Sequence, residues 1–98
     1  MIELTTAQRQ YLKGLAHTLS PVVMIGEKGL SEAVLKEIGH ALNAHELIKI
    51  KAGSNDKAQR SLWLDEICAA LGAAPVQHIG KTLVVYRPAE KAVIQLPR

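Results

Sequence analysis

A short segment bounded by glycines, Gly26-Glu27-Lys28-Gly29, is the part of the sequence best suited to chemistry. It lies between an apolar run that predicts a strand and a serine that can begin a helix. Glycine permits positive φ and has no side chain to keep a phosphate away, and the free N–H groups of a helix start attract anions. Lys28 adds a positive charge. The G-x-x-G pattern is typical of loops that clamp a nucleic-acid backbone, although a tight turn without a ligand has the same composition.

Basic side chains recur at spacings that place them on shared surfaces. One group lies on one face of a predicted helix, a second on the solvent face of a predicted strand, and a third in and after a predicted hairpin. In that order the groups are Arg9, Lys13 and His17; Lys49 and Lys51; Lys81 and Arg87. We expect these residues, with the glycine loop, to form an anion-binding surface, although solvated faces of amphipathic elements would look the same.

The sequence contains no convincing catalytic or metal site. Gly80-Lys81-Thr82 resembles the end of a Walker A loop, but Pro75 replaces the first glycine and a strand follows where a helix is required. His40 and His45 are five residues apart and so do not share a helix face as metal ligands would. Cys68 lies among apolar residues, where a thiol acts as a small hydrophobe. We therefore expect a protein that is not an enzyme and needs no metal or cofactor.

The first helix is predicted from a capping box of Thr5 and Gln8, in which each side chain bonds the other residue's N–H. Pro21 ends this helix by Ser20 because the residue before a proline avoids helical backbone angles. Helical spacing predicts a buried stripe on its inner face, formed by Ala7, Tyr11, Leu12, Leu15 and Leu19.

Two further helices follow from similar signals. Ser31 can cap a helix that continues to about His45. Asp56 and Gln59 have the spacing of a second capping box, and Gly72 is the expected end of that third helix.

Four runs of apolar and β-branched residues predict strands, the first of them buried on both faces. They are Val22–Ile25, Leu47–Ala52, Val76–Ile79 and Thr82–Tyr86. Gly80-Lys81 between the last two suits a type II′ hairpin turn. Residues 89–98 form either a short edge strand or a loosely packed extension. The order α-β-α-β-α-β-β predicts a two-layer α/β sandwich, with three helices on a mixed sheet of about four strands.

Length and composition indicate one folded domain, residues 1–98, because the hydrophobic fraction of 48% and the charged fraction of 21% are ordinary for globular proteins. The net charge of +3 favours an anionic partner without requiring one. Cys68 is the single cysteine, no apolar run approaches the roughly 20 residues that span a bilayer, and the start lacks a signal-peptide pattern. We expect a cytoplasmic monomer that does not enter membranes.

Five blocks of residues occur together in a recognisable order. They are Leu12–His17, Pro21–Val23, Ile25–Leu30, His45–Ile50 and Gly80–Arg87. In combination they resemble the CRM domain, the chloroplast RNA splicing and ribosome maturation family, in its stand-alone bacterial form of the YhbY type. The resemblance extends from Leu4 to about Pro97. The loop matches the family pattern except that Glu27 dilutes its positive charge.

The resemblance implies a fold similar to the C-terminal domain of bacterial translation initiation factor three. It also implies RNA binding through the G-x-x-G loop and the adjacent basic surface. Single-domain bacterial members are associated with precursors of the large ribosomal subunit, whereas plant members with several copies act in intron splicing. We therefore expect a non-catalytic assembly factor that binds ribosomal RNA. The alternative is a protein-interaction module that docks on a ribosomal protein or factor.

Overall fold

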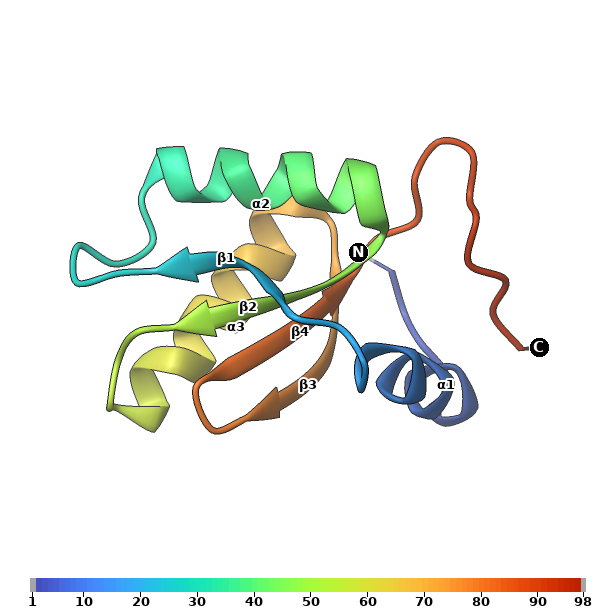
Figure 1. Cartoon of the computed structure of the whole chain (residues 1–98), viewed down its shortest axis with the longest axis horizontal. Coiled ribbons are helices and arrows are strands. Elements are labelled where there is room, and N and C mark those ends of the chain that lie inside the picture. Colours follow the sequence, from blue (N-terminus) through green and yellow to red (C-terminus); the bar gives the residue numbers. More distant parts are fainter. Residues whose placement is uncertain (1, 98) are drawn as a thin grey trace.

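The computed structural model describes residues 2–97 and contains helices and strands in the predicted order (Figure 1). The helices are α1 (Thr6–Ala16), α2 (Glu32–His45) and α3 (Lys57–Leu71), and the strands are β1 (Pro21–Ile25), β2 (Leu47–Ala52), β3 (Ala74–Ile79) and β4 (Thr82–Tyr86). One sheet has the strand order β1-β2-β4-β3; β1 and β2 are parallel, and the other neighbouring pairs are antiparallel. The predicted fold class, three helices on a mixed four-stranded sheet, is confirmed.

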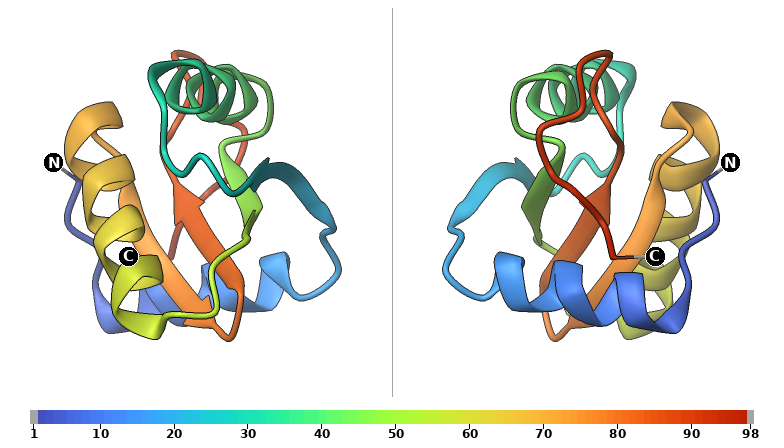
Figure 2. Two further views of the ribbon diagram at one scale, coloured as in Figure 1. Left: turned by 90° about the vertical axis from the view of Figure 1, so that its left-hand side faces the viewer. Right: turned by 90° about the vertical axis from the view of Figure 1, so that its right-hand side faces the viewer.

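The two faces of the sheet carry different helices (Figure 2). Side chains along a strand point alternately to the two faces. On β4, Leu83 and Val85 therefore join the core under α2 and α3, whereas Val84 and Tyr86 join a second core under α1. The sheet with α2 and α3 forms the predicted two layers, and α1 covers one part of the opposite face. Leu4, Ile94 and Leu96 pack against the same core, and the part of the face near Lys49 and Gln77 is open beside α1.

Local hydrogen bonds set most helix ends where the sequence predicts them. Thr5 and Gln8 form the reciprocal capping box of α1. The Ser31 hydroxyl accepts a 3.2 Å hydrogen bond from the Val34 N–H at the start of α2. Gly72 ends α3 with φ 64°, a left-handed conformation that favours glycine.

The start of α3 differs in one detail from its prediction. The Asp56 carboxylate caps the helix by accepting from the Ala58 N–H at 2.9 Å. The Asp56 N–H, however, donates to the hydroxyl of Ser54 at 3.1 Å and not to Gln59. The predicted capping box with Gln59 is therefore wrong, because a nearer hydroxyl satisfies the same N–H.

Helix α1 is shorter and less deeply buried than predicted. It ends at Ala16 with His17 as its C-cap, which agrees with the prediction that it ends by Ser20 but leaves Leu19 of the predicted stripe outside the helix. Its contact with the sheet is made by Leu12 and Ala16. The helix touches the sheet along a narrow stripe, which leaves the other predicted inner-face residues exposed: Ala7, Tyr11, Leu15 and Leu19.

Strand β1 is an edge strand and is covered on one face only. Val23 and Ile25 are buried under α2, whereas Val22 and Met24 are 47% and 62% exposed. The prediction of a strand buried on both faces is therefore wrong. An apolar run is compatible with either arrangement, and α1 does not extend over this part of the sheet.

The hairpin between β3 and β4 turns at Gly80-Lys81 as predicted. Gly80 has φ 52° and Lys81 does not have positive φ, which is the pattern of a type II′ turn. Strand β3 begins at Ala74, two residues earlier than predicted. The Lys81 carbonyl accepts a 2.7 Å hydrogen bond from the Ala52 N–H, so the hairpin tip lies beside the C-terminal end of β2.

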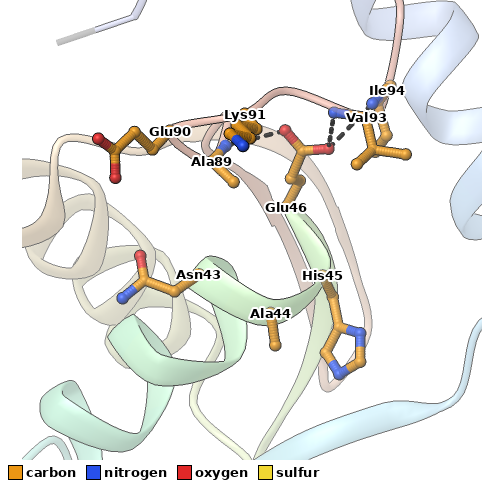
Figure 3. A pocket seen from close by; sticks show the side chains of 9 residues that line it. All are labelled: Asn43, Ala44, His45, Glu46, Ala89, Glu90, Lys91, Val93 and Ile94. Atoms are coloured by element: carbon orange, nitrogen blue, oxygen red, sulfur yellow. Dashed lines mark hydrogen bonds between the residues drawn. The ribbon is translucent and has the colours of Figure 1, made fainter.

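The chain after β4 is an extension without a strand, and Glu46 holds it in place (Figure 3). The buried Glu46 carboxylate accepts hydrogen bonds from the N–H groups of Ala89, Val93 and Ile94 at 2.8 to 2.9 Å. Burial raises the pKa of Glu46, but these three bonds outweigh that effect, so its pKa lies below the ordinary value. The charged carboxylate is thus the anchor of the extension.

Gly53 brings the loop after β2 directly against the end of β1. Its N–H donates a 2.8 Å hydrogen bond to the Ile25 carbonyl oxygen. A Cβ on Gly53 would lie 2.5 Å from the same oxygen, closer than real Cβ contacts allow. Because both groups belong to the backbone, only glycine permits this approach, and it aligns the segments that follow the two parallel strands.

We predict that Glu46→Gln loosens the extension. A neutral amide cannot accept three N–H bonds with the strength of a carboxylate, and each bond to a charged group contributes about 1.5 kcal/mol or more. Amide hydrogen exchange of Val93 and Ile94 at neutral pH should become at least about tenfold faster. Exposed Glu90→Gln is the control.

The contribution of Glu46 to stability depends on pH. Because its pKa is lowered on folding, this contribution is present above the usual value of about 4.3 and is lost as pH falls through the lowered pKa.

We predict that Gly53→Ala destabilises the protein by about 1 to 3 kcal/mol, the usual cost of forcing an extra methyl into a packed site. Gly26→Ala is the matched control, since its Cβ would meet nothing within 4 Å and its φ is not positive. Urea unfolding monitored by circular dichroism measures both. Equal stability of the Gly53→Ala variant and the unsubstituted protein would contradict the steric argument.

Candidate nucleic-acid interface

The G-x-x-G segment is a tight, solvent-exposed turn between β1 and α2. The Gly29 N–H donates to the Gly26 carbonyl at 3.0 Å, which leaves Glu27 and Lys28 exposed at the tip. Gly29 has φ 75°, so the backbone itself requires glycine there. Gly26 has no such need, and a Cβ on it would meet open space. Its missing side chain keeps the loop surface accessible to a ligand.

A shallow cleft separates this loop from the start of α3. It has a volume of about 500 Å³ and is lined by Gly26, Glu27, Lys28, Gly29, Gly53, Ser54, Gln59 and Trp63. The indole of Trp63 lies beneath Gly29, where a Cβ on the glycine would be 3.6 Å from Cζ2. The cleft is the space between two loops that Gly53 and Ile25 hold together, and it places Lys28 beside backbone that carries no bulky side chains.

Two further predicted lysines come to the same end of the sheet. Lys51 is exposed near the end of β2 and is paired with Thr82 at the start of β4. Lys81 is exposed in the adjoining turn, whose carbonyl bonds to Ala52. Since Ile25 pairs with Ala52, the G-x-x-G loop leaves the sheet at this end too. Lys28, Lys51 and Lys81 therefore form one basic end of the sheet.

Three other predicted residues meet in a groove between α1 and the open face of the sheet. Lys13 of α1, the C-cap residue His17 and Lys49 of β2 line this groove, which has a volume of about 590 Å³. Lys49 and Lys51 are two residues apart on one strand and so point to the same face. Strand β2 thus connects the groove to the basic end of the sheet.

The structure does not bring Arg87 to this surface. Arg87 follows β4 beside the start of β2, at the opposite end of the sheet from the loop. Its guanidinium donates to the carbonyl oxygens of Leu71 and Gly39 at 2.8 and 3.2 Å, and to the Asn43 side chain at 2.7 Å. These bonds tie α2 to the end of α3, so the role of Arg87 is structural.

Arg9 also has a structural role. Its Nε donates a 3.2 Å hydrogen bond to the Pro75 carbonyl, and the residue is half-buried. It lines neither the cleft nor the groove. The predicted charged face of α1 therefore divides between Arg9, which holds β3, and Lys13 and His17, which face the groove.

Arg60, which the sequence analysis did not single out, supports the β2–α3 loop on the other side of the cleft. Arg60 is 9% exposed, and its Nη1 donates to the Ser54 carbonyl at 2.8 Å while its Nε donates to His78 Nε2 at 3.3 Å. It thereby fixes the β2–α3 loop against β3. The available signal was its position three and four residues before Trp63 and Leu64 on the inner face of a helix.

The described residues do not contain an evident catalytic centre. Burial, aided by the charge of Asp65, raises the pKa of the Cys68 thiol to about 11, so it stays protonated at neutral pH. The Glu46 carboxylate lines a hollow of about 650 Å³ but is occupied by the three backbone bonds (Figure 3). Within residues 2–97, no group of three or more His, Cys, Asp or Glu could hold a metal ion. No helix in this range is long and apolar enough to span a membrane.

Comparison with known proteins gives consistent matches along the chain. A Haemophilus influenzae protein named as an RNA-binding protein is 55% identical over 98 residues, which is 100% of this chain and 99% of that protein. A Bacillus subtilis protein named as a probable RNA-binding protein is 33% identical over 95 residues, 96% of this chain and 99% of that protein. The solution structure of a hypothetical Staphylococcus aureus protein has a TM-score of 0.85 at 34% identity and covers 97% of this chain and 100% of that chain.

The model of the CRS1 / YhbY (CRM) domain family matches residues 4–87, which include all three helices and all four strands. The same range holds the G-x-x-G loop and the groove beside α1. With relatives of this identity and coverage, the chain belongs to the CRS1 / YhbY (CRM) domain family.

Proposed function

We propose that this protein binds RNA without catalysis and grips the phosphate backbone with the Gly26–Gly29 loop. The observation that carries the proposal is the position of this loop beside Lys51 and Lys81, at the one end of the sheet where β1 and β2 both terminate. The names of the relatives as RNA-binding proteins support RNA as the ligand.

The chemistry of the loop limits what it can recognise. Backbone N–H groups and lysine ammonium groups bind phosphate oxygens, which are the same in every sequence. Glu27 at the tip reduces the local positive charge, so Lys28 acts together with Lys51 and Lys81 rather than alone. The loop therefore positions the RNA.

The finer proposal is that the RNA is ribosomal and belongs to precursors of the large ribosomal subunit. Membership of the CRM family and the matches over 99% of two bacterial relatives support it, since stand-alone bacterial members are associated with such precursors. We further propose that the protein acts as a monomer in the cytoplasm. An assembly factor of this kind would leave the mature subunit once the RNA has folded.

A second candidate function is docking on a ribosomal protein or assembly factor. The observation that favours it is an apolar groove of about 460 Å³ between α1 and β1, where the exposed side chains of Leu15, Leu19 and Val22 lie together. Exposed apolar patches commonly mark protein contacts. This groove is separate from the basic end of the sheet, so the two functions can be tested separately.

We predict that Lys28→Ala weakens RNA binding and reduces its salt dependence. Each lost phosphate contact lowers the slope of log affinity against log salt by about 0.7 to 0.9. The triple variant Lys28→Ala, Lys51→Ala and Lys81→Ala should lower it by about two to three. Lys91→Ala, at an exposed lysine in the C-terminal extension, matches the change in net charge of the single Lys28→Ala variant. Fluorescence anisotropy with labelled RNA at several salt concentrations measures both quantities.

Two sets of variants distinguish the two candidate functions, one assayed by RNA affinity and the other also by association with ribosomal particles. If the folded triple variant binds RNA as tightly as the Lys91→Ala protein, the site assignment is wrong. If Leu15→Ser with Val22→Ser abolishes association with ribosomal particles while RNA affinity is unchanged, protein docking dominates.

We also predict where the protein is found in cells. Sedimentation of lysate on a density gradient should place it with immature large subunits and not with mature ribosomes. The triple lysine variant should move to the free-protein fractions, because it has lost its phosphate contacts. A distribution that is the same for both proteins would contradict the ribosomal part of the proposal.

A further inference from the structure

The groove between α1 and the open sheet face has features that the phosphate-binding loop does not explain. Its volume of about 590 Å³ lies within the range of about 300 to 1,000 Å³ for pockets that hold small ligands, a size class that includes a single nucleotide. The β2 lysines connect it to the basic end of the sheet. The side chains that line the groove indicate which part of an RNA chain it could bind.

Gly14 lies within α1 on the wall of this groove. Glycine is less favourable than alanine inside a helix because it loses more backbone freedom on folding. Packing does not require it here, since a Cβ on Gly14 would meet nothing within 4 Å, and its φ is not positive. The helix thus carries a destabilising residue that the fold does not need, and its one structural effect is to leave the groove wall open.

The other lining side chains combine three kinds of chemistry. Gln10 and Gln77 each offer amide donors and an acceptor, the groups that pair with the edges of bases. Lys13 and Lys49 supply positive charge for a phosphate, and none of the residues lining the groove is acidic. Val84 and Ala16, both buried, belong to the apolar core beneath the groove. A groove with positive charge, hydrogen-bonding amides and an apolar floor matches a nucleotide better than a bare phosphate.

We propose that this groove binds one unpaired nucleotide of the RNA, with its base against Gly14 and its base edge toward Gln10 and Gln77. The inference rests on the proposed RNA-binding function and adds a class of target, RNA with an unpaired residue near the segment held by the loop. Strand β2 gives the path between the two sites: from Lys49 in the groove to Ala52 beside the loop is three residues, or about 10 Å.

A duplex would not satisfy this groove. In A-form RNA the base edges of the major groove lie too deep for side chains to reach, and paired bases have their Watson–Crick edges occupied. The amides of exposed Gln10 and half-buried Gln77 line a groove between a helix and a sheet, and a base that has left its stack has free edges to offer them. The loop, by contrast, needs only phosphates, which a duplex also provides.

The test compares two substitutions at Gly14 with one at another helical glycine. Gly14→Ala and Gly14→Leu add side chains of increasing size to the groove wall. Gly39→Ala in α2 is the matched control, because it brings the same gain in helix propensity at a site where its Cβ makes only an ordinary 3.6 Å contact with Leu71. Each full-length variant is titrated with an unstructured RNA strand and with an RNA duplex of equal length.

We expect Gly14→Ala to raise the midpoint of thermal unfolding by about 4 to 8 °C, the usual effect of this change in a protein of this size. Affinity for the unstructured strand should nevertheless fall by about fivefold, and by about tenfold or more for Gly14→Leu, the range of a lost base contact. Duplex affinity and the salt slope should stay unchanged, because no phosphate contact is removed. Gly39→Ala should leave every affinity unchanged.

Two outcomes would overturn the inference and are distinguishable from failure of the proposed function. If both Gly14 variants bind the unstructured strand as tightly as Gly39→Ala, the groove does not hold a nucleotide, while the loop proposal stands as long as the triple lysine variant is weak. If strand and duplex affinities fall equally, Gly14 acts on the whole surface and not on a base. If the triple lysine variant also binds normally, the proposed function fails as well.

Discussion

The hydrogen bond from the Gly53 N–H to the Ile25 carbonyl is the contact on which the candidate site depends. It joins the first residue after β2 to the last residue of β1, at the end of a parallel strand pair. Because a Cβ on Gly53 would come within 2.5 Å of that oxygen, the contact exists only with glycine. The G-x-x-G loop and the start of α3 consequently leave the sheet side by side, with the Trp63 indole under Gly29.

The features that the sequence predicted well are local ones. The capping box of Thr5 and Gln8, the left-handed Gly72 and the Gly80 turn each depend on residues a few positions apart, so their chemistry can be read from the chain. The exposed outer face of β1 and the short α1 depend on which strand lies at the sheet edge and how far a distant helix reaches. An apolar run of residues is compatible with a strand at the edge of a sheet and with one in its interior.

Some residues of the candidate site could be predicted from the sequence, and others could not. Lys28 and Lys51 were predicted because glycine spacing and strand alternation place charge on an exposed surface. Arg9 and Arg87 have the same charge, but their partners are mainly backbone carbonyl oxygens, which leave no trace in the sequence. Lysine presents a single flexible ammonium, whereas a guanidinium can bridge several carbonyls at once, which suits arginine to this structural use. The steric role of Gly53 became evident only with β1 in place.

The most direct test of the central claim is an NMR titration of the isotope-labelled protein with RNA, following every backbone amide. The account predicts that the largest shift changes occur from Gly26 to Gly29 and at Lys51 and Lys81, with little change around Arg87. It would be contradicted if the largest changes appeared instead at Leu15, Leu19 and Val22 while the loop amides stayed unchanged.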